Sequence, residues 1–196
     1  FETGFERDLS RIARHGAKAA LQEIEQSELT DAFWDFGLPQ RLESSSINNP
    51  QFRSFLASQV KAKAQAFLSK HSSVHDMIEI QGDIHHLVPK DYLRKNGVND
   101  KREYNQVANY AMTETAVNIR IGNRLPADYL DEVKTQIRSG QTTLGEITTE
   151  ADFDKSFEEN AVPASLFETT VENFEDFLIE RRRLMAKKMK EYYFSL

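Results

Sequence analysis

The stretch Gly82-Asp83-Ile84-His85-His86-Leu87-Val88-Pro89-Lys90 carries the most information about how this chain folds and what it could bind. It places two adjacent imidazoles before an apolar turn that contains proline. A neutral imidazole can bind a metal ion or accept a proton near neutral pH, because its unperturbed pKa is about 6.5. Two amide side chains, Asn109 and Asn118, follow along the chain. These four side chains are candidates for one site that combines a metal ion with a base.

The geometry of the histidine pair is restricted by the strand that should carry it. Adjacent residues on a regular strand point to opposite faces. His85 and His86 can therefore serve one site if the strand ends, bends or bulges there, which Pro89 favours. Alternatively, one imidazole faces the metal and the other faces the water from opposite sides. A further interpretation is an ordinary pair at a strand end, packed by its neighbours.

Composition narrows the chemistry of any metal site. The chain has 196 residues and no cysteine, and a chain of this length can bury a sizeable core without disulfides. The lack of cysteine excludes thiolate metal sites and cysteine nucleophiles. A metal would need ligands from His, Asn, Asp or Glu, so we expect a hard cation, Mg²⁺ or Mn²⁺.

Charge and hydropathy bear on partners and location. No apolar run approaches the roughly 20 residues of a membrane-spanning helix, so we expect a soluble chain with no membrane partner. The first residue is Phe1 rather than Met, which suggests a piece cut from a longer protein. The net charge of −6 argues mildly against indiscriminate nucleic-acid binding. The basic run over 181–190 predicts either a solvated helix face or a strip that contacts phosphates.

The hydrophobic pattern predicts a mainly α fold: a helical body with a small central ββα unit. We expect helices over 5–24, 31–42 and from Pro50 onward, and a short strand over 78–81 that runs into the histidine motif. A second strand over 109–113, a short helix over 115–121 and a helix over 126–138 follow. The chain should close with an irregular acidic stretch and a long helix over 163–193. This divides it into an N-terminal helical region (1–75), a central unit (76–139) and a C-terminal region (140–196) that packs on the same domain.

The stretches 83–89, 109–113 and 117–120 resemble the HNH nucleases, also called ββα-metal or His-Me finger nucleases. The resemblance implies a metal-dependent nuclease in which His85 and Asn118 hold the metal. It also implies that His86 is the general base and that Asn109 orients this base by hydrogen bonding. Asp83 lies two residues before His85, so it is either a partner that fixes the imidazole tautomer or an ordinary turn residue.

A closer resemblance extends over 82–93, 105–109, 118–123 and 126–130. These stretches are similar to the C-terminal nuclease domain of GmrSD-type restriction enzymes. The similarity implies a DNA endonuclease that is the effector domain of a bacterial, cytoplasmic phage-restriction protein of the kind that senses modified DNA. It also implies a ParB-like, nucleotide-hydrolysing N-terminal domain as partner in the same full-length protein.

Basic residues around the motif are candidates for phosphate contacts: Lys90, Arg94, Lys95, Lys101, Arg102, Arg120 and Arg124. Two alternatives to a DNA endonuclease stay open. One is an inactive module that keeps the HNH fold and binds DNA or a partner. The other is RNA as the substrate, although nothing in the chain resembles an RNA-reading aromatic sheet.

Overall fold

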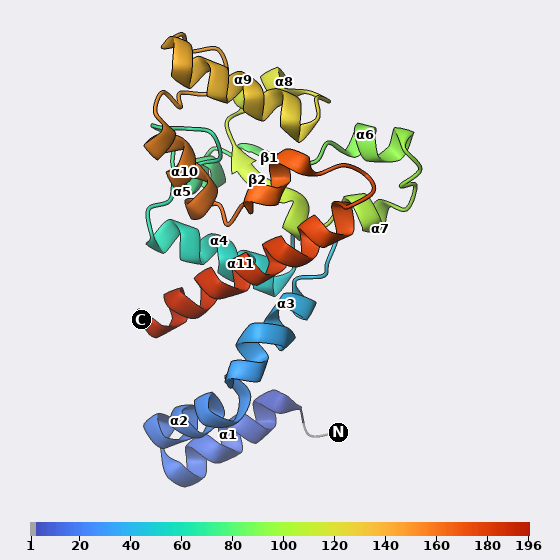
Figure 1. Ribbon diagram of the computed structural model, residues 1–196. Coiled ribbons are helices and arrows are strands. Elements are labelled where there is room, and N and C mark those ends of the chain that lie inside the picture. The colour runs from blue at the N-terminus through green and yellow to red at the C-terminus, as the bar shows by residue number, and fades with distance from the viewer. Residues whose placement is uncertain (1–2) are drawn as a thin grey trace.

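The computed structural model describes residues 3–196 and is mainly helical, with one two-stranded sheet near its centre (Figure 1). The predicted mainly α fold with a small central sheet is therefore confirmed. In chain order the elements are α1 (Gly4–His15), α2 (Ala17–Glu28), the π-helix η1 (Phe33–Gly37), α3 (Leu38–Arg41), α4 (Pro50–Lys61), α5 (Val74–Glu79), β1 (Asp83–His86), α6 (Lys90–Lys95), α7 (Lys101–Tyr104), the 3-10 helix η2 (Val107–Asn109), β2 (Tyr110–Thr113), α8 (Thr115–Ile121), α9 (Pro126–Ser139), α10 (Glu150–Glu159), the 3-10 helix η3 (Ala164–Glu168) and α11 (Phe174–Phe194).

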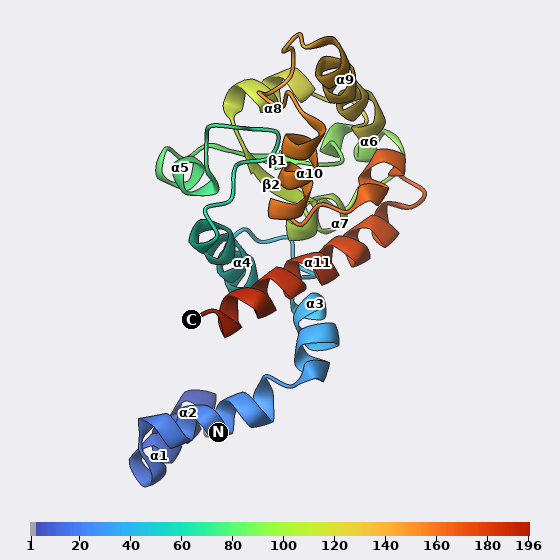
Figure 2. The same cartoon turned by 60° about the vertical axis from the view of Figure 1, so that its left-hand side comes forward.

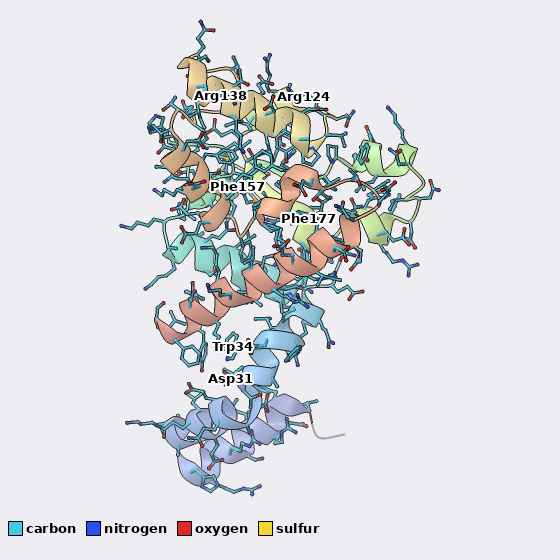
Figure 3. All side chains as sticks on the ribbon, in the orientation of Figure 1. Asp31, Trp34, Arg124, Arg138, Phe157 and Phe177 are labelled. Atoms are coloured by element: carbon cyan, nitrogen blue, oxygen red, sulfur yellow. The ribbon has the colours of Figure 1, made fainter. Side chains whose placement is uncertain are left out.

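The N-terminal segment forms a helical hairpin instead of the single helix expected over 5–24. Gly16 adopts a φ of +80°, which ends α1 and lets α2 fold back beside it. A capping box between Thr3 and Glu6 starts α1. Figures 1 and 2 show this hairpin standing away from the rest of the molecule. Asp31 and Trp34, labelled in Figure 3, lie where the hairpin meets the body, and Trp34 packs against Tyr193 of α11.

The central sheet pairs β1 and β2 antiparallel. Its register places His85 opposite Ala111 and His86 opposite Tyr110. Helix α8 follows β2 directly and contacts β1. The expected second strand and short helix are thus found at Tyr110–Thr113 and Thr115–Ile121. The chain therefore has a β-β-α order, with α6, α7 and η2 inserted between the two strands.

The strand expected over 78–81 was wrong, because those residues end α5 and the turn after it. The alternation of Ile78 and Ile80 imitates a strand, but Ser73 and Asp76 form a capping box that starts a helix just before it. Gln81 then takes a positive φ and turns the chain into β1. The capping box that starts α5 therefore determines the structure of this segment, and the alternation of the two isoleucines does not.

The C-terminal region is also more regular than its sequence indicates. The acidic stretch contains α10, which Thr149 caps by accepting from the Asp152 amide. Helix α11 begins at Phe174 rather than at Pro163, since η3 and a loop occupy the residues between. The larger buried cluster runs from Trp34 to Met189, so helices from both ends of the body share it.

Candidate catalytic site

Three of the predicted site residues lie together on one face of β1. Asp83 and His85 share this face because they are two residues apart on a strand. Asn118 projects from α8 and lies between them: its Oδ1 is 3.0 Å from His85 Nδ1, and its Nδ2 donates to Asp83 Oδ2 at 3.2 Å. A carboxylate only accepts hydrogen bonds, so Asp83 sets the orientation of the amide and turns its oxygen toward the imidazole.

The sequence left two roles open for Asp83, a partner that fixes the imidazole tautomer or an ordinary turn residue. In the structure its carboxylate does not contact the ring directly but accepts from Asn118, whose amide lies between Asp83 and the ring. Asp83 therefore acts on His85 through Asn118.

His85 is held in a closed environment. Its side chain is 2% exposed, Phe67 stacks on the ring and Tyr129 meets it edge-on. Burial lowers the pKa of His85 to about 4, against the opposing effect of the Asn118 hydrogen bond. The ring is thus neutral at pH 7, which is the state a metal ligand requires. Its Nε2 is buried and has no hydrogen-bond partner within the described residues.

The His85–Asn118 pair fits the chemistry of a hard divalent cation. In the structure Nδ1 carries a hydrogen and donates it to Oδ1 at 3.0 Å, because an amide oxygen only accepts. Holding a cation with these two atoms would require the tautomer with the hydrogen on Nε2. Two neighbouring ligands at right angles, each about 2.1 Å from such an ion, lie about 3 Å apart. Among residues 3–196, no group of three or more His, Cys, Asp and Glu is placed to hold a metal. A two-ligand site suits Mg²⁺, which keeps water and substrate oxygens as its other ligands.

His86 lies on the opposite face of the strand and has different partners. Its ring meets Tyr110 edge-on at 4.9 Å, and its Nε2 is 3.0 Å from Oδ1 of Asn105. An amide oxygen only accepts, so Nε2 carries the hydrogen and donates it. The other nitrogen, Nδ1, keeps its lone pair, has no hydrogen-bond partner among residues 3–196 and is not one of the buried unpaired atoms. This is the arrangement of an oriented base.

The ionisation of His86 fits the same role. Burial is the largest cause that lowers its pKa below 6.5, the Asn105 hydrogen bond raises the pKa, and the nearby charge of Lys90 lowers it. The ring is therefore neutral at pH 7 and able to accept a proton. The regular register of β1 keeps the two imidazoles on opposite faces, and the strand ends at His86.

The amide of Asn109 does not contact the His86 ring, contrary to our expectation. It is completely buried in η2, where its Oδ1 accepts from the Val88 amide and its Nδ2 donates to the Val88 carbonyl, both at 2.9 Å. Its own carbonyl accepts from Leu87. Asn109 thus fixes the turn that follows the histidine pair, while Asn105 makes the contact to the ring.

All four arginines proposed as phosphate contacts are already paired with carboxylates. Arg120 and Arg124 both donate to Glu132 of α9, whose side chain is 19% exposed. Arg94 lies 3.8 Å from Asp91, and Arg102 pairs with Asp100. Of the seven basic candidates, Lys90, Lys95 and Lys101 are exposed and have no carboxylate partner among residues 3–196.

Two arginines of the basic run on α11 are buried, so they belong neither to a solvated face nor to a surface that could contact phosphates. Arg181 is completely buried and donates to the carbonyls of Ala108, Asn160 and Ala161. Arg182 is also buried and pairs with Glu175, and only Arg183 of the three is exposed. Burial lowers the pKa of Arg181 to about 9, which still leaves it charged at pH 7.

The sequence did not reveal three residues that shape this site. Asn105 holds His86, Tyr129 donates to the Leu87 carbonyl at 2.9 Å, and Arg181 anchors η2 through the Ala108 carbonyl. Each depends on elements that meet only in the folded chain. Only Asn105 has a local sequence signal, because an Asn is a common residue at the C-terminal end of a short helix such as α7.

The chain matches no family model, no curated protein and no solved structure. Within the described residues, no helix has the length and apolar character needed to cross a membrane.

Proposed function

We propose that this chain is an HNH-type endonuclease domain that hydrolyses phosphodiester bonds of DNA with Mg²⁺ or Mn²⁺. The observation that carries the proposal is the position of His85 and His86. One neutral imidazole converges with Asn118, and the other is fixed by Asn105, with its second nitrogen unpaired within the described residues. The β1-β2-α8 order supports it, because it presents the histidine pair and Asn118 from the first strand and from the helix of a ββα unit.

In this proposal the residues of the chain divide the chemistry between them. His85 and Asn118 hold the cation, which supplies positive charge to the phosphate when it is bound. His86 Nδ1 takes a proton from water as the water oxygen bonds to phosphorus and the bond to the leaving ester oxygen breaks. Asp83 holds Asn118 in the orientation that presents its oxygen. A neutral imidazole and a neutral amide leave the charge of the cation uncancelled, which favours an anionic phosphate.

The substrate would approach from the side of the segment inserted between the strands. Lys90 begins α6, is exposed and is close enough to lower the pKa of His86. Lys95 and Lys101 lie farther along the same segment. We propose these three lysines as the main phosphate contacts, with Arg94 as a secondary one. Arg120 and Arg124 are weaker candidates, because both are already paired with Glu132.

The biological role that we propose for the domain rests on the resemblance of its sequence to GmrSD-type enzymes. We propose that the domain is the effector half of a phage-restriction protein in a bacterial cytoplasm, and that a ParB-like, nucleotide-hydrolysing domain of the same protein controls its access to modified DNA. Incubating the full-length protein with modified and plain DNA, with and without nucleotide, tests this assignment. Equal cleavage of both DNAs under all conditions would contradict it.

A second candidate function is an inactive module that keeps this fold and binds DNA or a partner. The enclosure of His85 between Phe67 and Tyr129 favours it, because a buried histidine bonded to an amide can be purely structural. The experiment that separates the two is nicking of supercoiled plasmid with Mg²⁺ or Mn²⁺, with a chelator as control. The nuclease proposal predicts chelator-sensitive nicking, and the binding module predicts retention of DNA without nicking.

Asn118→Ala is expected to raise the Mn²⁺ concentration needed for half-maximal nicking by roughly 10- to 100-fold, the usual effect of weakening a metal site. The change removes one ligand oxygen and leaves His85 in place. Asn123→Ala, in the exposed turn after α8, is the matched control and should need no more Mn²⁺ than the wild type. An unchanged requirement in Asn118→Ala would remove this residue from the metal site.

Asn105→Leu is expected to lower the maximal cleavage rate by roughly 10-fold or more, because His86 loses the acceptor that sets its ring. The Michaelis constant for DNA should stay near the wild-type value, since Asn105 is not expected to contact phosphate. Asn105→Asp keeps an acceptor oxygen and should recover most of the rate. A spectroscopic readout is independent of cleavage: the Nε2 proton of His86 should be visible by NMR in the wild type and lost to solvent exchange in Asn105→Leu. If that proton persists in Asn105→Leu, Asn105 does not hold the ring.

A further inference from the structure

The first helix of the hairpin turns its apolar side to solvent. Phe5, Leu9 and Ile12 recur at helical spacing and are 72%, 48% and 36% exposed, and no residue of α1 is buried. The opposite face carries Arg7 and Arg11, which pair with Glu28 of α2. Helix α1 thus packs on its neighbour through polar side chains. An amphipathic helix normally buries the apolar face, so a partner surface is missing.

A groove of about 770 Å³ on the body offers an apolar surface of matching character. Helices α4 and α5 and the two strands line it, and Leu56, Val60 and Met112 are among its apolar side chains. Ile47 and Ile78, which also line it, are 49% and 43% exposed. A half-exposed apolar lining of this size is characteristic of a surface that binds a partner.

The charges around the two surfaces are complementary. Glu6 and Asp8 lie on the two borders of the apolar stripe of α1, at the angles that helical geometry gives them. Within the helix Glu6 accepts from the Thr3 amide and Asp8 lies 3.5 Å from Arg11, so each acid has a local partner as well. Arg53 and Lys61 line the groove, both are exposed, and no Asp or Glu lines it. Among residues 3–196 neither cation pairs with a carboxylate; Arg53 donates to the Asn48 amide oxygen. This is notable in a chain with 31 acidic residues.

We propose that α1 of one copy binds in this groove of a second copy, with each copy donating its helix to the other. Both views show the hairpin away from α5 and the sheet, so α1 does not fill the groove of its own chain (Figures 1 and 2). Reciprocal exchange of an identical element closes a twofold dimer and buries both apolar surfaces at once. The interaction is a helix in a groove, with Phe5, Leu9 and Ile12 as anchors.

The test is the mass of the whole chain by sedimentation velocity across a wide concentration range. The wild type should be a dimer that dissociates on dilution. Leu9→Glu on the helix and Ile78→Glu on the groove should each raise the dissociation constant by roughly 10- to 100-fold. Both positions are exposed, so neither change should unfold the chain. Phe36→Glu is the control, because Phe36 is 68% exposed but belongs to neither surface.

A mixing experiment distinguishes the reciprocal exchange of α1 from other modes of dimerisation. A Leu9→Glu chain keeps its groove and an Ile78→Glu chain keeps its helix, so their mixture retains one of the two contacts. The mixture should therefore associate more tightly than either variant alone. A chain that stays monomeric at all concentrations would overturn the proposal. So would a dimer that Ile78→Glu leaves unchanged, since that result indicates pairing through the hairpins alone.

Discussion

Replacing His86 with alanine is expected to lower the rate of plasmid nicking by roughly 10²- to 10⁴-fold, the usual contribution of a general base. This loss is expected because the two ring nitrogens of His86 have different surroundings. Asn105 holds Nε2, and Nδ1 has no hydrogen-bond partner in the described part of the chain. His86 directly follows the candidate ligand His85 in β1, although the two rings lie on opposite faces of the strand. The measurement is the initial rate of supercoiled plasmid conversion at saturating Mn²⁺.

The matched control for this prediction is His75→Ala. His75 is an exposed histidine of α5 near Glu79, outside the candidate site. Its loss should leave the nicking rate within twofold of the wild type. Thermal unfolding of both variants should show that each is folded. Undiminished nicking by a folded His86→Ala chain would contradict the role of His86 as base.

Replacing Arg181 with methionine is expected to lower the free energy of unfolding by about 3–5 kcal/mol. Two effects oppose each other. Methionine avoids the cost of burying a guanidinium, which is visible in the pKa lowered to about 9. However, the partners of Arg181 are the backbone carbonyls of Ala108, Asn160 and Ala161, which cannot be replaced along with it. Each buried carbonyl left without a hydrogen-bond donor costs about 1–3 kcal/mol. The three carbonyls together therefore cost more than is gained by no longer burying the guanidinium.

Urea unfolding of Arg181→Met measures this loss, and Arg183→Met supplies the control. Arg183 lies on the same helix but is exposed, so its replacement should change stability by less than about 0.5 kcal/mol. A loss below about 1 kcal/mol in Arg181→Met would show that these carbonyls find other donors. The Ala108 contact also ties α11 to η2, so partial loss of nicking by folded Arg181→Met is expected as a secondary effect.

The β-β-α order could be predicted because its signals are local. The apolar run after Asn109 and the helical spacing of 115–121 identify the second strand and the helix within one residue at each end. The same local reasoning found the start of α4, where Asn49 caps and Pro50 takes the first turn. Local signals failed over 78–81, where two isoleucines imitate a strand and the capping box at Ser73 prevails.

The contacts within the site were less accessible to sequence reasoning. The convergence of Asp83, His85 and Asn118 follows from strand alternation together with the position of α8. Strand alternation predicted the shared face of Asp83 and His85, and the resemblance to HNH nucleases implied the pairing of His85 with Asn118. The partner of His86 could not be chosen between two asparagines four residues apart. Asn109 is drawn into the core by the turn at Val88, which leaves Asn105 to meet the ring. Arg181 could not be recognised as buried, because the carbonyls that hold it come from η2 and the end of α10.

The most direct test of the central claim is pulsed EPR of the chain loaded with Mn²⁺, in a His71→Ala, His75→Ala background that removes two exposed histidines. His85 and Asn118 as ligands predict one bound ion with a hyperfine coupling to an imidazole nitrogen, and predict that this bound ion is lost or weakened in Asn118→Ala. The measurement does not depend on cleavage or on a partner domain. Failure to bind Mn²⁺, or binding without nitrogen coupling, would contradict the metal site and with it the proposed nuclease.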